Sequence, residues 1–229
     1  QIGDTGTIYS DSFIASIYDT KKNDGIYIHL CTVVNGTLSV GDSVMADIED
    51  VRRDAICRNH SAAHLLQAAL RSVLGTHVEQ AGSYVSNNVC RFDFTHFAPL
   101  TQDEIHRVEN MVNMNILAAN NIITMETDIE TARANGAMAQ KRKKYGKIVR
   151  MVKMGNFSTE LCGGTHCNNT GKIGLFKIIS ESSVAAGIRR IEAVTGMGVL
   201  NLIAEKDKLI CDTATELKVQ NPVDIAKRA

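Results

Sequence analysis

The sequence lacks tryptophan and has only two prolines among its 229 residues. It also lacks an apolar run long enough to cross a membrane, so no transmembrane helix is predicted. Basic and acidic residues number 25 each, which makes the formal net charge zero with histidine neutral. This balance argues against a protein coated all over by nucleic acid, but it is compatible with a local basic patch.

Cysteine is sparse, and no signal peptide is visible. The six cysteines are scattered along the chain, without the density of a secreted disulfide framework. We therefore expect a reducing, cytoplasmic environment, in which most cysteines are small buried side chains. The first residue is Gln1 rather than methionine, which favours a piece of a longer protein.

The pattern of strands and helices predicts an α+β fold in three parts. Residues 1–50 contain short β-prone runs separated by turn signals such as Asn35-Gly36, and they predict a small β-barrel. Residues 51–196 mix strands and helices without a regular βαβ repeat, which predicts a mainly antiparallel sheet with helices on one face. Residues 197–229 predict a helix with a seam for a partner helix.

Three helix boundaries are marked by local signals. Residues 50–74 predict a long helix that ends at Gly75. Thr101-x-x-Glu104 and Thr127-x-x-Glu130 are capping boxes, and each predicts the start of a further helix.

Four side chains have the spacing of a metal site. His60 and His64 stand four apart in the predicted helix, on one face and one turn apart. Cys162 and His166 are also four apart and flank a glycine pair. Three imidazoles and one thiolate suit a tetrahedral zinc ion. On a helical wheel the two helix histidines fall away from the main apolar stripe, so filling the core does not explain them.

The sequence leaves the role of this zinc open. Four ligands would close a structural site, whereas a catalytic site usually keeps one open position. A metalloprotease would need a glutamate directly after the first histidine, and Ser61 stands there instead. A nucleophilic pair of Cys162 and His166 is a further alternative, but the two other histidines favour metal.

Several polar residues could bind substrate or RNA. Gln80 lies in a strand-like run, where it could position an ester or amino group or could simply face solvent. The dense positive run of Lys141, Arg142, Lys143 and Lys144 suits either RNA phosphates or a solvated helix face. Arg189 and Arg190 alternate on a predicted strand, so one could pair with an acid while the other reaches a phosphate.

Five motifs, in this order, resemble the editing region of alanyl-tRNA synthetase. That region is shared with free-standing alanyl-tRNA deacylases and, more distantly, with the second domain of threonyl-tRNA synthetase. The resemblance covers nearly all of residues 1–196. The motifs are Arg58-Asn-His-Ser-Ala-Ala-His-Leu-Leu, Gly75-Thr-His-Val-Glu-Gln-Ala-Gly-Ser, Arg91-Phe-Asp-Phe-Thr-His, Leu161-Cys-Gly-Gly-Thr-His and Gly187-Ile-Arg-Arg-Ile-Glu-Ala-Val-Thr-Gly.

The resemblance implies a function and a set of site residues. One zinc ion per chain would be held by His60, His64, Cys162 and His166. Gln80 would lie in the editing pocket, where we assign it the catalytic role, and we assign substrate binding to Gly163, Gly164 and Thr165. The RNA-binding residues would be Lys141, Arg142, Lys143, Lys144, Arg189 and Arg190, although the family has a phenylalanine-glycine-acid run where this chain has Lys141-Arg142-Lys143.

The implied substrate is tRNA(Ala) mischarged with serine or glycine, whose ester bond is hydrolysed. An alanine pocket cannot exclude glycine by size, and one hydroxyl group discriminates serine by only about 1–3 kcal/mol, so a second, hydrolytic site is needed. The resemblance also implies a domain organisation. The ATP-dependent aminoacylation domain would precede Gln1. Residues 1–50 would resemble a translation-factor barrel, and residues 197–229 would begin an oligomerising helical region. The alternatives are a non-catalytic tRNA-binding module with a structural zinc and a free-standing deacylase.

Overall fold

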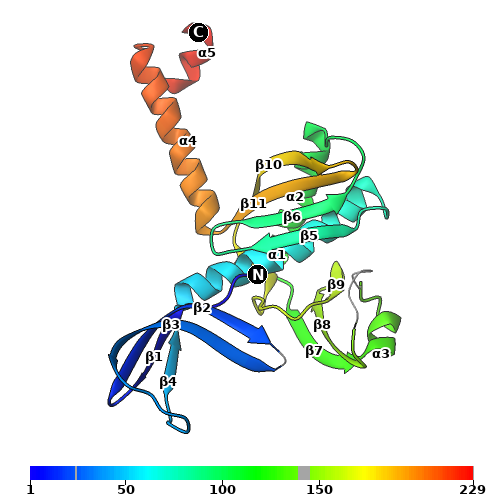
Figure 1. Ribbon diagram of the computed structural model, residues 1–229. Coiled ribbons are helices and arrows are strands. Elements are labelled where there is room, and N and C mark those ends of the chain that lie inside the picture. The colour runs from blue at the N-terminus through cyan, green and yellow to red at the C-terminus, as the bar shows by residue number, and fades with distance from the viewer. Residues whose placement is uncertain (24, 139–144, 229) are drawn as a thin grey trace.

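The structure is a computed structural model that describes residues 1–23, 25–138 and 145–228. The described residues form three antiparallel sheets with helices packed beside them, which confirms the predicted α+β class (Figure 1). None of the helices in these ranges is long and apolar enough to cross a membrane.

The first sheet is built by the N-terminal strands, in the order β3-β2-β1-β4. Within the described ranges no pairing joins its edge strands β3 and β4, so the predicted barrel is not confirmed. The strands are β1 (Gly6–Ser10), β2 (Phe13–Asn23), β3 (Ile26–Gly36) and β4 (Met45–Ile48).

The predicted hairpin turn at Asn35-Gly36 is wrong, because β3 runs through both residues. Gly36 pairs with Phe13 across the sheet and has a φ of 76°. A Cβ atom there would collide with the backbone of Ser12. The glycine therefore serves a close approach between two strands, which has the same sequence signature as a turn.

The second sheet carries the main core, in the order β10-β11-β6-β5. Its strands are β5 (Gln80–Val85), β6 (Cys90–Thr95), β10 (Phe176–Ala185) and β11 (Ile188–Thr195). Helices α1 (Asp50–Leu74) and α2 (Gln102–Leu117) cover one face of this sheet through a single apolar cluster. The cluster includes Leu65, Leu66, Phe92, Phe94, Val108, Val112 and Ile191.

Local signals mark the C-terminal end of α1 and the N-terminal end of α2. The amide of Gly75 donates to the carbonyl of Arg71, and its φ of 117° ends α1 at the predicted residue. The capping box of Thr101 and Glu104 is confirmed by hydrogen bonds in both directions. These contacts fix the residue at which α1 ends and the residue at which α2 begins.

The third sheet consists of β7 (Ile122–Asp128), β8 (Ile148–Met154) and β9 (Ser158–Leu161). Its short helix α3 (Ile129–Ala134) is capped by Asp128, whose side chain accepts from the amide of Thr131. The predicted cap at Thr127 is therefore wrong by one residue, because β7 continues through it. Strand β9 contacts α1 and so brings the following residue, Cys162, to the helix.

The C-terminal part is the helix α4 (Met197–Glu216), which projects away from the sheets (Figure 1). A 3-10 turn at Pro222–Asp224 and the short helix α5 (Ile225–Arg228) follow. The predicted helix is confirmed. Its apolar side chains Leu200, Ile203 and Leu209 are exposed.

Candidate metal centre and its cavity

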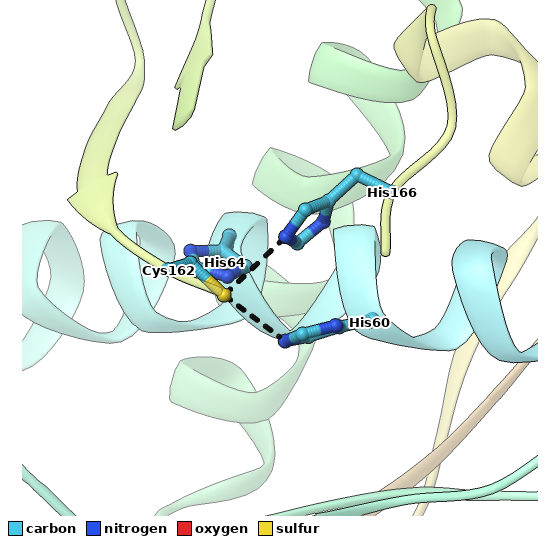
Figure 2. Close-up of side chains that lie close together, drawn as sticks. All are labelled: His60, His64, Cys162 and His166. Carbon is cyan, nitrogen blue, oxygen red and sulfur yellow. Dashed lines mark hydrogen bonds between the residues drawn. The ribbon is translucent and has the colours of Figure 1, made fainter. Parts of the chain in front are cut away.

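Four side chains from two distant segments meet at one point. One ligand atom from each of His60, His64, Cys162 and His166 lies within 4.8 Å of the others. Figure 2 shows the three imidazoles arranged around the sulfur of Cys162. The Nε2 atoms of His60 and His166 each lie 3.4 Å from this sulfur. Ligands about 2.0–2.3 Å from a tetrahedral ion are separated by similar distances.

The loop that carries Cys162 is held by one arginine. Arg150 of β8 donates through Nη1 to the carbonyl of Cys162 at 2.9 Å and to that of Gly164 at 2.6 Å. The backbone carbonyl of Arg150 accepts from the amide of Cys162 at 3.0 Å. Strand β8 therefore clamps the loop from both directions, and the metal ligands of the loop are oriented before any ion binds.

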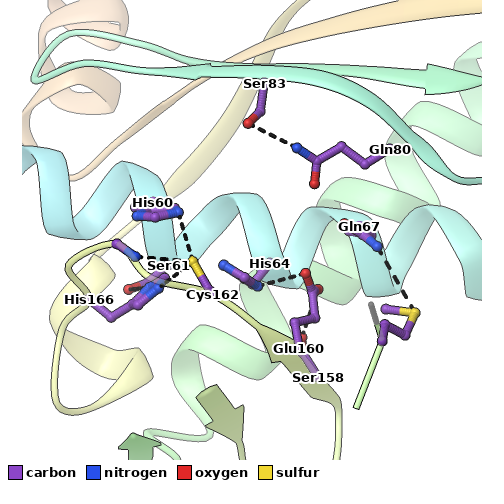
Figure 3. Close-up of polar contacts among 12 residues, drawn as sticks. His60, Ser61, His64, Gln67, Gln80, Ser83, Ser158, Glu160, Cys162 and His166 are labelled. Carbon is purple, nitrogen blue, oxygen red and sulfur yellow. Dashed lines mark hydrogen bonds and ion pairs between the residues drawn. The ribbon is translucent and has the colours of Figure 1, made fainter. Parts of the chain in front are cut away.

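Each histidine has its Nδ1 atom engaged by another polar group. Nδ1 of His60 lies 2.8 Å from Oε1 of Gln1. Nδ1 of His64 lies 2.8 Å from Oε2 of Glu160, and Figure 3 shows this contact. Nδ1 of His166 lies 3.3 Å from Oγ of Ser61. Such contacts fix the ring orientation and leave Nε2 for a metal, as is typical of histidine ligands.

The electrostatics of the cluster favour a thiolate. Burial opposes ionisation of Cys162, but hydrogen bonds from His166, His60 and His64 outweigh it and lower its pKa to about 2. Burial likewise opposes the charged form of His64, yet Glu160 and Cys162 raise the pKa of His64 to about 10. Burial and the neighbouring histidines lower the pKa of His166 to about 4.

These observations fit a metal ion. The donor set offers one thiolate and three imidazoles, the ligand types that zinc accepts in tetrahedral sites. Each imidazole is already oriented through Nδ1. The four side chains can thus hold a metal ion, as the spacing predicts.

A cavity of about 650 Å³ opens beside the cluster. Three of the candidate ligands, His60, His64 and Cys162, line it. On the opposite side lie Gln80 and Ser83 of β5, and Gln80 donates through Nε2 to Oγ of Ser83 at 3.0 Å (Figure 3). The predicted catalytic glutamine and the metal cluster therefore share one cavity.

The polar side of α1 forms one wall of this cavity. His60, His64, Gln67 and Arg71 all line it. Two of them, His60 and His64, are the residues that the helical wheel separates from the apolar stripe, while Leu65 and Leu66 are fully buried in the main core. Two functions of one helix, packing and site formation, thus lie on opposite faces.

The other predicted site residues are placed as follows. Gly164 lies against His60, and the amide of Thr165 donates to Oε1 of Gln1, whereas Gly163 is exposed. None of the three is among the residues that line the described cavity. Their assignment to substrate stays a prediction.

The predicted RNA-binding arginines both have acidic partners. Arg189 pairs with Glu181 at 2.5 and 2.7 Å, and Arg190 pairs with Asp93 at 2.6 and 2.7 Å. Each strand neighbour of β11 thus supplies an acid to one of the two arginines. The assignment of Arg189 and Arg190 to RNA stays a prediction. Lys141, Arg142, Lys143 and Lys144 lie outside the described residues.

Four supporting residues escape prediction from the sequence: Gln1, Ser61, Arg150 and Glu160. Gln1 and Arg150 are remote from every motif, and their contacts exist only once the chain has folded. Glu160 carries a weak signal, since it stands two residues before Cys162 and a strand places alternate residues on one face. Ser61 carries no signal of its own, because the pattern marks it only as the residue that stands where a metalloprotease needs a glutamate.

Comparison with known proteins first shows to which class of protein domain part of the chain is similar. A family model described as "Threonyl and Alanyl tRNA synthetase second additional domain" matches residues 149–192, which include most of β8, all of β9 and the loop of Cys162 and His166. The chain thus carries a domain of the kind found in these two tRNA synthetases.

More specific relatives are two enzymes named alanine--tRNA ligase. The one from Alkaliphilus oremlandii is 48% identical over 227 residues, or 98% of this chain. The one from Acetivibrio thermocellus is 49% identical over 229 residues, or 100% of this chain. The chain spans 26% of the length of each relative. The predicted relationship to the editing region of alanyl-tRNA synthetase is confirmed.

Proposed function

We propose that this chain hydrolyses the ester bond of tRNA(Ala) that carries serine or glycine, with one zinc ion per chain. Water adds to the ester carbonyl and the bond to the tRNA oxygen breaks, which releases the amino acid and a free tRNA hydroxyl. The observation that carries this proposal is the position of the metal cluster. Three candidate ligands face a cavity of about 650 Å³ rather than the closed core expected around a purely structural ion.

Different residues of the chain have different roles in the proposed reaction. His60, His64, Cys162 and His166 would hold the ion, which when bound supplies a Lewis acid that polarises a carbonyl or lowers the pKa of water. Glu160 keeps the ring of His64 oriented through Nδ1. Gln80 faces the same cavity, and its carboxamide suits the orientation of an ester or an amino group rather than proton transfer.

The proposed partner is tRNA(Ala), and the rest of a synthetase chain would supply aminoacylation. Gly163, Gly164 and Thr165 are proposed to contact the aminoacyl end, because they connect two metal ligands beside the cavity. Arg189 and Arg190 are proposed to contact RNA only through guanidinium N–H groups that their ion pairs with Glu181 and Asp93 leave available. We further propose that residues 1–50 form a translation-factor-like domain, that residues 51–196 form the editing domain and that residues 197–229 contribute to oligomerisation.

Deacylation of Ser-tRNA(Ala) by the wild type and by Cys162→Ala tests the proposal. Removal of the thiolate should lower the rate by at least about 100-fold, since even residues that only support a ligand cost about 10–100-fold. The matched control is Cys211→Ala, which alters an exposed cysteine on α4. Equal rates for wild type and Cys162→Ala would contradict the zinc role.

The second candidate is a tRNA-binding module with a structural zinc. This candidate is supported because all four protein ligands can bind one ion together. A tetrahedral zinc ion would then have no coordination position left for water or substrate. In that case the wild type binds tRNA, a chelator unfolds the chain, and neither Ser-tRNA(Ala) nor Gly-tRNA(Ala) is hydrolysed. Turnover by the wild type excludes this candidate.

A further inference from the structure

Gln67 is a buried amide on the wall of the cavity. It lies on α1 one turn beyond His64 and lines the same space (Figure 3). The residue is only 8% exposed. A glutamine in such a position normally has strong hydrogen-bond partners, because a buried amide without them destabilises the fold.

The neighbouring polar side chains have such partners. Arg71 donates to the carbonyls of Thr76 and Val78 at 2.9 and 2.7 Å. Glu160 contacts both Nδ1 of His64 at 2.8 Å and Oγ of Ser158 at 3.2 Å.

Across the cavity the pattern is the same. Oγ of Ser83 accepts from Gln80 at 3.0 Å, and Oγ1 of Thr95 donates to the carbonyl of His77 at 2.7 Å. The polar lining on both sides is thus largely committed to contacts within the protein.

Gln67 differs from these residues. Among the residues that the structure describes, its side chain has one hydrogen-bond contact, from Nε2 to the sulfur of Met138 at 4.0 Å. A thioether is a weak acceptor, and no contact within the described ranges engages the amide oxygen. The carboxamide can therefore offer its oxygen as an acceptor, and its weakly engaged NH2 group as a donor, to a ligand in the cavity.

We propose that Gln67 is the residue that recognises the side-chain hydroxyl of the amino acid to be removed. A hydroxyl both donates and accepts, and a carboxamide offers the complementary pair of groups. Apolar neighbours such as Met138, Leu161 and Phe92 line the cavity as well and give a hydroxyl few alternatives. Gln67 is then a specificity residue, whereas the metal cluster and Gln80 act on the ester. This inference rests on the proposed deacylation.

Such a residue would explain how the site admits serine but spares alanine. A site built to hydrogen-bond a hydroxyl is left with unpaired buried polar groups when the hydroxyl is missing, and it rejects that analogue strongly. Glycine lacks the hydroxyl too, so its hydrolysis should not depend on Gln67. The ratio of kcat/KM for Ser-tRNA(Ala) to that for Gly-tRNA(Ala) is therefore the informative quantity.

The test measures this ratio for the wild type, Gln67→Met and Gln67→Leu. Both variants keep the approximate volume of the side chain and remove the amide. The ratio should fall by about tenfold, the usual effect of losing one buried hydrogen bond. Because both substrates are measured in one protein preparation, a partly unfolded variant changes the two rates equally and leaves the ratio intact.

Two further variants serve as comparisons for the two deacylation rates. Gln80→Met should lower both rates together, and Gln102→Met, at an exposed position on α2, should change neither. A ratio that stays at the wild-type value in both Gln67 variants overturns the inference while the proposed function stands. A wild type that hydrolyses neither ester overturns the proposed function and this inference with it.

Discussion

Nδ1 of His64 lies 2.8 Å from Oε2 of Glu160, and each of the two side chains is 8% exposed. This pairing of a buried carboxylate with a buried imidazole occupies Nδ1 of the ring and leaves Nε2 as the nitrogen for a metal ion. It also explains why Glu160, which is not a candidate ligand, matters to the metal centre. A carboxylate behind a ligating histidine raises the basicity of the ligand and fixes its tautomer.

Glu160→Gln should therefore weaken zinc binding without removing a ligand. The neutral amide keeps the shape of the side chain but loses the charge that favours a strongly donating imidazole. We expect zinc affinity to fall by about 10–100-fold, measured by competition with a chromogenic chelator. Glu126→Gln, at an exposed position of β7, is the matched control. An unchanged affinity in Glu160→Gln would refute this role.

The two glycines of the Cys162 loop should respond differently to a methyl group. A Cβ at Gly164 would collide with the ring of His60 and with Oε1 of Gln1, whereas a Cβ at Gly163 would meet nothing within 4 Å. Gly164→Ala should displace a ligand and lower zinc affinity by at least about tenfold.

Gly163→Ala is the control for that substitution and should retain the zinc affinity of the wild type. Chelator competition on both variants distinguishes a local collision from a general sensitivity of the loop. If the two alanine variants lose zinc equally, the close packing of Gly164 against His60 is not the cause.

Arg150 should stabilise the loop even though it touches neither metal nor cavity. Arg150→Met removes hydrogen bonds to the carbonyls of Cys162 and Gly164. Hydrogen bonds from a charged group contribute about 1.5–3 kcal/mol each, and part of this free energy should be lost. Urea unfolding at pH 7 measures the change, with Lys153→Met on the same strand as the control. A free energy of unfolding equal to that of the control would speak against the clamp.

The ion pair of Asp93 and Arg190 should make stability depend on acid pH. The hydrogen bond from Arg190 outweighs burial and holds the pKa of Asp93 below its usual value. A carboxylate with a lowered folded-state pKa stabilises the fold fully above its unfolded pKa of about 3.9, and this stabilisation is lost as the pH falls through the folded value.

Asp93→Asn should consequently flatten the decline in unfolding free energy below about pH 4. Urea unfolding at a series of pH values between neutrality and strong acid compares the wild type with Asp93→Asn. Protonation of the metal ligands affects both proteins, so the difference between the two curves isolates this pair. Parallel curves over the acid range would rule out a contribution from Asp93.

Periodic and local signals predicted most of the elements but not how some of them pair. The helix of residues 50–74, its end at Gly75 and the capping box at Thr101 follow from short-range rules of backbone chemistry. The turn signal at Asn35-Gly36 failed because a glycine required for close strand packing looks the same as one required for a turn. No sequence signal marks strand β9, because four residues are too few to show alternation.

The sequence alone determined the four candidate ligands and the face of α1 that bears two of them, since ligand chemistry and helical periodicity are properties of neighbouring residues. Only the tertiary structure decided that three of these ligands, His60, His64 and Cys162, line a cavity shared with Gln80. It alone revealed the partners Gln1, Ser61 and Glu160 behind the imidazoles, and the sparse contacts of Gln67. These relationships join residues far apart in the chain, so they depend on how the second and third sheets pack against α1 rather than on any local pattern.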